Sequence, residues 1–162
     1  LVGAGLKDDI RLACSGKQIS AYAIASSMAL GADWVNTARG FMFSLGCIQS
    51  MRCHDNTCPT GIATQDKYRQ QGLVVPEKAD RVANFHRNTL LALADLVGAA
   101  GCEHPADLTP QHLMRKMGNH YAVSADVAYG LLPKGVLLSD PASTVLGDDW
   151  AAARADSFAP VW

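Results

Sequence analysis

The first apolar run of the chain leads into a glycine turn and then into a helical segment. Residues 10–14 predict a short strand, and Ser15-Gly16-Lys17 predicts a tight turn after it. Residues 21–30 are rich in helix formers, and Ser20 before them is a suitable N-cap because its hydroxyl can accept from a free amide. Gly31 stands where a C-cap glycine is common, which completes one strand–turn–helix unit.

The same order follows once more. Residues 33–37 predict a second strand, and Ala38-Arg39-Gly40 turns into a helical stretch at 41–46. Short connections in this order favour parallel strands with helical crossovers, and therefore an α/β fold. Because two strands do not make a stable sheet alone, we expect the chain to hold the end of a larger sheet or barrel.

A long amphipathic helix is predicted from Val75-Pro76 to about residue 97, ended by Gly98 and Gly101. Its apolar side chains recur at helical spacing and are expected to be core or interface: Val82, Phe85, Thr89, Leu90, Leu93, Leu96 and Val97.

A short helix with Thr109 as N-cap is expected at 109–117, and a loop-rich tail follows it. The predicted divisions are the end of a barrel, a cysteine loop, a helical extension and the tail, at 1–46, 47–65, 66–118 and 119–162.

Composition narrows the class of protein. The 162 residues are 49% hydrophobic and 18% charged with a net charge of -1, which is typical of a globular protein and gives no reason to expect nucleic acid as a partner. No signal peptide and no apolar run of about 20 residues is present, so this segment does not indicate a membrane. A segment preceding Leu1 would be free to carry either feature. We expect a cytoplasmic protein.

Three of the five cysteines lie within twelve residues, at Cys47, Cys53 and Cys58. An odd, clustered set suits a metal site in a reducing compartment better than disulfides. Thiolates favour iron–sulfur clusters and zinc, and Pro59 resembles the Cys-Pro ending of ferredoxin motifs. Zinc with His54 as fourth ligand and plain buried thiols remain alternatives. Cys14 and Cys102 are expected to be small buried residues.

The two glycine turns are candidates for phosphate binding. Each follows a strand and precedes a helix, where free amides attract anions, and Lys17 and Arg39 would add positive charge. The five candidate residues are Ser15, Gly16, Lys17, Arg39 and Gly40. Each turn alone is more simply explained as a connection, and it is the pair of turns that favours phosphate binding; no Walker A pattern is present.

Three segments resemble the FMN-binding glutamate synthase family, and the likeness runs over about residues 5–117. The two turns with the stretch between them resemble the last two strand–helix units of its barrel. Its cluster loop is resembled by Leu45 to His54 and Asn56 to Gln65, and the next helix of its single-subunit members is resembled by Arg81 to Leu90. A looser likeness extends to the tail at 155–158.

The resemblance implies the C-terminal part of a (β/α)8 barrel that binds FMN, with the phosphate held at Ser15, Gly16, Lys17, Arg39 and Gly40. It implies a 3Fe–4S cluster on Cys47, Cys53 and Cys58, with electrons passing between cluster and flavin. The implied reaction is reductive amination of 2-oxoglutarate to glutamate or a related one, by an oxidoreductase acting on CH–NH2 donors. The implied partners are this small substrate and the rest of the barrel or an electron-donor protein.

Two departures from the family stand out. Ala21 and Ala23 occupy positions where many relatives have Gly and Asp, and the earlier strands are absent, so this segment alone is expected to be inactive. The alternatives are a non-catalytic iron–sulfur or zinc-binding module and a remnant that binds nothing.

Four side chains near these motifs are assigned other roles. Trp34 and His86 are expected in the core, and His54 is expected beside the metal or exposed. Arg52 is expected either to offset cluster charge or to be solvated.

Overall fold

The computed structural model describes residues 1–159 and divides into two compact units. One unit is Ala13–His112, and the other combines Leu1–Leu12 with the chain from Leu113 onward. The first unit carries every predicted site residue.

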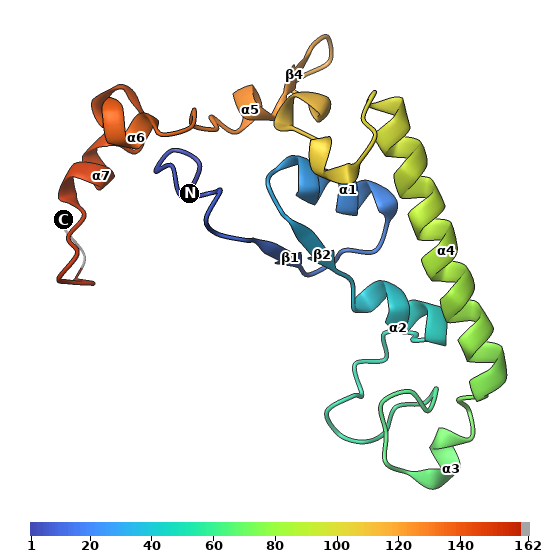
Figure 1. Ribbon diagram of the computed structural model, residues 1–162. Coiled ribbons are helices and arrows are strands. Elements are labelled where there is room, and N and C mark those ends of the chain that lie inside the picture. The colour runs from blue at the N-terminus through green and yellow to red at the C-terminus, as the bar shows by residue number, and fades with distance from the viewer. Residues whose placement is uncertain (160–162) are drawn as a thin grey trace. The chain divides into compact units, whose positions relative to one another are not determined.

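A pair of parallel strands organises the first unit (Figure 1). Strands β1 (Ala13–Ser15) and β2 (Trp34–Asn36) pair in parallel, and helix α1 (Ala21–Ala29) connects them. The hydroxyl of Ser20 accepts from the amide of Ala23 at 3.2 Å, which confirms the predicted N-cap. The predicted strand–helix–strand order and the mixed α/β character are therefore present.

Only one face of this strand pair is covered. Cys14 lies on the α1 side, where its thiol is 3.4 Å from the Ser27 hydroxyl. Trp34 on β2 pairs with Ala13, the neighbour of Cys14, so its side chain lies on the opposite face of the strand pair. It is 48% exposed, and its predicted place in the core was therefore wrong. Side chains alternate across a strand, and Trp34 belongs to the face that no element of this unit covers.

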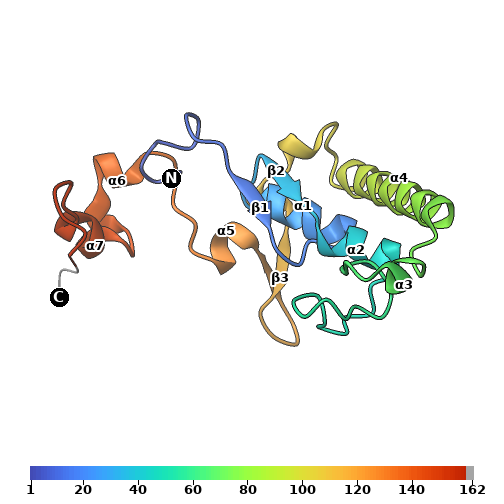
Figure 2. The ribbon, with the colours of Figure 1, turned by 90° about the horizontal axis from the view of Figure 1, so that it is seen from below.

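Helix α4 (Val75–Ala99) packs along α1 and α2 (Arg39–Leu45), as Figure 2 shows. The Phe41 and Phe85 rings meet edge to face with centroids 5.2 Å apart. Gly40 permits this approach, because a Cβ at Gly40 would stand 2.7 Å from Cζ of Phe85. The helix α2 begins at Arg39, two residues before the predicted start.

The predicted apolar stripe of α4 is only partly buried. Leu93 and Val97 are buried, whereas Leu90 is 49% exposed because α1 and α2 cover a narrower face than the pattern suggested. The helix continues through Gly98 and ends before Gly101, whose φ of 76° stops it. Gly98 was therefore wrong as a terminator.

The helix predicted at 109–117 is also wrong. After an earlier 3-10 turn at Pro105–Asp107, this stretch forms a second 3-10 turn at Pro110–His112 and then strand β3 (Met114–Lys116). Strand β3 pairs antiparallel with β4 (Ala122–Ser124), so a partner several residues ahead overrides the local helical preference.

The second unit holds β3 and β4 and a series of short elements. These are α5 (Ala125–Ala128), α6 (Val136–Ser139), a 3-10 turn (Pro141–Ser143) and α7 (Gly147–Ala152). Within residues 1–159, no helix has the length and apolar character needed to cross a bilayer.

Candidate cofactor site

The two predicted phosphate turns lie at the same edge of the strand pair. Ser15 is the register partner of Asn36, so β1 and β2 end side by side and both turns leave from their carboxyl ends. The Thr37 hydroxyl donates to the backbone carbonyl of Gln18, which ties the second turn directly to the first. Carboxyl ends of parallel strands are the usual place for ligands in α/β folds.

The first turn is open and positively charged. Gly16 has φ +89° with no atom within 4 Å of an added Cβ, and Lys17 also has a positive φ of 55°. The side chains of Lys17 and Arg39 are exposed, and neither has an ion-pair partner among residues 1–159. The first turn therefore leaves open space for an anion, and each turn supplies one exposed cation, Lys17 from the first and Arg39 from the second.

The second turn differs from the prediction in the placement of Gly40. Gly40 is buried inside the first turn of α2 against Phe85, so its small size already has a packing reason. Ala38 precedes α2 without a side-chain cap, which leaves the first amides of α2 to backbone partners, solvent or a ligand. Of the two alanines singled out at the start of α1, Ala21 is buried, and the backbone amide of Ala23 donates to the Ser20 hydroxyl.

An unused polar group lies beside the first turn. The Gln18 amide nitrogen donates to the Cys14 sulfur at 3.5 Å, while its buried oxygen Oε1 has no hydrogen-bond partner within the described chain. A buried acceptor without a donor is costly, and a ligand hydroxyl or a water would satisfy it.

The cysteine loop is held by its own polar residues. The Thr64 hydroxyl donates to the Asn56 carbonyl at 2.7 Å, and Asp55 accepts from the Thr57 amide at 3.0 Å. Thr64 is buried, which is unusual for an isolated threonine and is explained by this bond. Sequence reasoning missed Asn56 and Thr64, because only their contact across the loop gives them a role.

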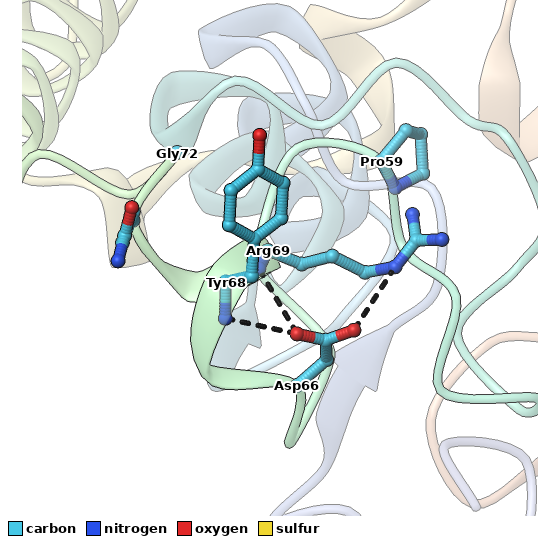
Figure 3. Close-up of a pocket in the computed structure, with 6 residues that line it drawn as sticks. Pro59, Asp66, Tyr68, Arg69 and Gly72 are labelled. Carbon is cyan, nitrogen blue, oxygen red and sulfur yellow. Dashed lines mark hydrogen bonds and ion pairs between the residues drawn. The ribbon is translucent and has the colours of Figure 1, made fainter.

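A short helix closes the loop and borders a cavity of about 540 Å³ (Figure 3). Asp66 is the N-cap of this helix, α3 (Lys67–Gln70), and its carboxylate accepts from the amides of Tyr68 and Arg69 at 2.9 and 3.3 Å. The Arg69 guanidinium lies 3.6 Å from Asp66 and donates to the Thr57 carbonyl. The two charged side chains that line the cavity, Asp66 and Arg69, are therefore already engaged in holding the loop.

Gly61 packs directly against this helix. Its φ is +78°, and an added Cβ would stand 2.3 Å from the Arg69 carbonyl oxygen. Only glycine fits such a backbone contact in the left-handed region.

The three thiols have different surroundings. The Cys58 sulfur is buried, and the Thr60 hydroxyl with the amides of Ala63, Thr60 and Ile62 lowers its pKa to about 7. The Gln49 amide donates to the Cys47 sulfur at 3.5 Å, and Cys53 is exposed. Amides directed at sulfur favour the thiolate that iron–sulfur clusters require.

The structure does not gather these thiols into one site. Across residues 1–159, no three His, Cys, Asp or Glu side chains are placed to hold a metal together. Yet Gln49, Met51 and Asn56 all have positive φ, between 55° and 64°, and such strain in non-glycine residues concentrates at ligand-binding loops. The donor chemistry fits a cluster, and assembly would require the loop to rearrange.

The other residues singled out in the sequence are exposed or only partly buried. His54 is exposed, and Arg52 pairs with Asp55 at 3.5 Å on the surface. His86 is exposed rather than in the core, with its ring 5.9 Å from that of Phe41. Cys14 and Cys102 are partly buried rather than fully buried.

Comparison with known proteins finds a family model and several relatives that match this chain. The family model described as "Conserved region in glutamate synthase" matches residues 1–103. The chain is 40% identical over 122 residues to the glutamate synthase large subunit-like protein YerD of Bacillus subtilis, covering 75% of this chain and 23% of that protein.

Other relatives share a lower identity with the chain. The archaeal NADPH glutamate synthase of Methanocaldococcus jannaschii is 35% identical over 97 residues, covering 60% of this chain and 19% of that protein. The NADH glutamate synthase of Saccharomyces cerevisiae is 35% identical over 101 residues, which is 62% of this chain and 5% of that protein. The chain therefore spans less than a quarter of the length of each of these relatives.

Proposed function

This chain belongs to the glutamate synthase family, and we propose that it is the C-terminal part of a longer FMN- and iron–sulfur-dependent oxidoreductase of that family. In this proposal, residues 1–46 end an FMN-binding (β/α)8 barrel and residues 47–65 hold a 3Fe–4S cluster. The reaction is reductive amination of 2-oxoglutarate to glutamate, or a closely related one. The substrate-binding residues would lie in the remainder of the protein.

The observation that carries the proposal is the meeting of the two turns. The register of Ser15 with Asn36 and the bond from Thr37 to Gln18 bring both turns to one edge of the sheet. Lys17 and Arg39 extend from this edge, and neither pairs with a carboxylate among residues 1–159, so they would neutralise a flavin phosphate. Gln18 Oε1 would accept from a hydroxyl of the same ligand.

Bound FMN would supply hydride transfer and a bound cluster would supply single-electron transfer. The chain's own residues hold these groups. The Thr60 hydroxyl and the loop amides lower the pKa of Cys58 to about 7, which favours its thiolate, while Cys47 and Cys53 would complete the ligand set as the loop rearranges. Gly61 and α3 anchor the far end of the loop during that change.

Cofactor analysis of the longer protein tests this function. Purified protein should contain flavin, iron and acid-labile sulfide, and Cys53→Ser should remove the iron–sulfur absorption while most of the FMN remains. Cys102→Ser, a thiol outside the loop, is the matched control and should keep both. Lys17→Ala with Arg39→Ala should weaken FMN binding and leave the cluster intact.

The same analysis separates the alternative of a non-catalytic module. Iron–sulfur absorption without any flavin would identify an electron-transfer or structural module, and colourless protein with bound zinc would reject both iron assignments. Equal loss of flavin and cluster in Cys53→Ser would show instead that the loop supports the whole barrel.

A further inference from the structure

The chain enters the cysteine loop beside two cations that belong to another helix of the same compact unit. A Cβ at Gly46 would stand 3.8 Å from Nζ of Lys78 and 4.0 Å from Nη1 of Arg81. Both cations come from the first two turns of α4, three residues apart, and therefore lie on one face of that helix. Gly46 directly precedes Cys47, the first of the three clustered thiols.

The backbone of Cys47 is held next to these cations. Its amide donates to the Met42 carbonyl at 3.0 Å and so closes the C-terminal end of α2. Helix α2 in turn packs on α4 through the edge-to-face contact of Phe41 with Phe85. A rearrangement of the loop would therefore leave the first thiol beside the two cations.

The two cations share one carboxylate. The Glu77 carboxylate lies 3.1 Å from Lys78 and 4.0 Å from Arg81, so within residues 1–159 one negative charge is paired with both positive charges. The Lys78 side chain is only 15% exposed, and a charge withdrawn from water is costly unless opposite charge is near. The entrance to the cysteine loop therefore keeps a surplus of positive charge.

Arg52, the cation that the sequence suggested for offsetting cluster charge, is placed differently. It pairs with Asp55 at 3.5 Å, and its side chain is well exposed. Its charge is thus already matched, and solvent and salt screen what remains. Lys78 and Arg81 are the better placed pair for acting on the loop.

We propose that Lys78 and Arg81 act on the iron–sulfur cluster through their charge and favour its one-electron reduction. Reduction adds one electron, supplied by the reduced flavin of the proposed function, and makes or breaks no bond. Fixed positive charge beside the first ligand stabilises the more negative, reduced state and so raises the reduction potential. This effect rests on the proposed cluster, whereas the placement of the two cations beside Cys47 does not.

The reduction potential of the longer protein, measured by potentiometric titration, tests the charge effect. Lys78→Gln with Arg81→Gln should make one-electron reduction about threefold to tenfold less favourable, which is a shift of about 30–60 mV to lower potential. Glu77→Gln removes the shared carboxylate and should shift the potential upward. Arg87→Gln, the same loss of charge farther along α4 beside Asn84, is the matched control and should leave the potential unchanged.

Shifts of opposite sign separate a charge effect from a structural one. If the cations only capped the C-terminal end of α2, the variants would lose stability and keep the potential. An unchanged potential in the double glutamine variant would overturn the charge effect, as would the absence of an upward shift in Glu77→Gln. Lys78→Arg with Arg81→Lys keeps both charges and should keep the potential, and a shift in this exchange would also contradict the proposal.

Alkylation of the metal-free longer protein tests the placement independently of any cluster. The ratio of the rates of anionic iodoacetate and neutral iodoacetamide at one thiol reports the local electrostatic potential, because the reactivity of the thiol itself cancels. The double glutamine variant should lower this ratio about twofold to threefold at Cys47. The ratio at Cys102, which follows the far end of α4, should not change. An unchanged ratio at Cys47 would overturn the placement.

The two measurements also separate this inference from the proposed function. If the unaltered longer protein holds no iron–sulfur cluster, the proposed function and the effect on reduction both fail, while alkylation still decides the placement of the cations. A cluster whose potential does not respond to the double glutamine variant would overturn only the charge effect.

Discussion

The two turns and the cysteine loop differ in what brings their residues together. Strand pairing and the Thr37–Gln18 bond place the turns side by side without any ligand. The loop has a scaffold of its own at Asn56 and Thr64, yet its three sulfurs are not gathered.

This contrast follows from the kind of bond each site uses. Backbone pairing between strands is complete before a ligand arrives, so a phosphate site can be preformed. Three thiolates in one place repel one another unless a metal offsets their charge, so a cluster site forms together with its cluster.

The largest expected effect comes from Gly61→Ala in the longer protein, which should break the loop and spare the turns. The methyl group would meet the Arg69 carbonyl at 2.3 Å in a left-handed backbone, for a local cost of about 3 kcal/mol or more. Iron content and amide protection in residues 56–70 should fall while FMN remains. Loss of FMN to the same extent would remove the distinction between the two regions.

Gly40→Ala should have the next largest effect and act on the turns. The new methyl would press on the Phe85 ring at 2.7 Å, and because a side chain can shift, the cost should be about 1–3 kcal/mol. Urea unfolding measures this cost. Gly98→Ala in the exposed part of α4 is the control and should stabilise by up to about 1 kcal/mol. A neutral Gly40→Ala would show that α2 and α4 are not closely packed.

Thr60→Val sharpens the account of the loop before any metal binds. Removal of its hydroxyl should raise the pKa of Cys58 from about 7 toward its ordinary 9.0. A rise of about one unit would lower the thiolate fraction at neutral pH about fivefold. Thiolate absorbance of metal-free protein measures the change, and Thr57→Val, whose hydroxyl contacts Asp55 instead, is the control.

The lowered pKa of Cys58 also makes the free energy of unfolding depend on pH. Because the folded pKa of Cys58 is lowered, its contribution to stability is complete above the ordinary value of 9.0 and is lost as the pH falls through about 7. Thr60→Val should flatten this dependence of stability on pH. If the dependence is unchanged in the variant, it arises from a group other than Cys58.

Ser20→Ala gives the smallest effect and tests the region of the two turns, which strand pairing forms without a ligand. Loss of the 3.2 Å bond to the Ala23 amide should cost about 1 kcal/mol and fray the start of α1. Helical circular dichroism and the unfolding midpoint report it, and cluster content should not change. A loss of cluster would mean that the loop depends on α1.

Local chemistry made part of this fold predictable. Ser20 caps α1 through its own hydroxyl, Pro76 suits the first turn of α4, and left-handed glycines end α1 and α4 at Gly31 and Gly101. The two turns were also predictable as neighbours, because parallel strands with a short crossover must end at the same edge.

The other parts of the fold could not be predicted, because they depend on contacts between residues that are distant in the sequence. Residues 114–116 pair with 122–124 and become a strand despite their helical composition. Trp34 is exposed because its face of the sheet has no cover in this unit, which no local pattern reveals. The contribution of Thr64 and the tight fit of Gly61 depend on contacts across the cysteine loop.

The parallel pair of β1 and β2 has a practical consequence. Within residues 1–159 these strands pair only with each other, so each has an outer side whose amides and carbonyls no strand of this chain receives. Such rows accept strands from neighbouring molecules. If residues 1–162 are produced by themselves, their solutions should therefore cloud or self-associate as concentration rises.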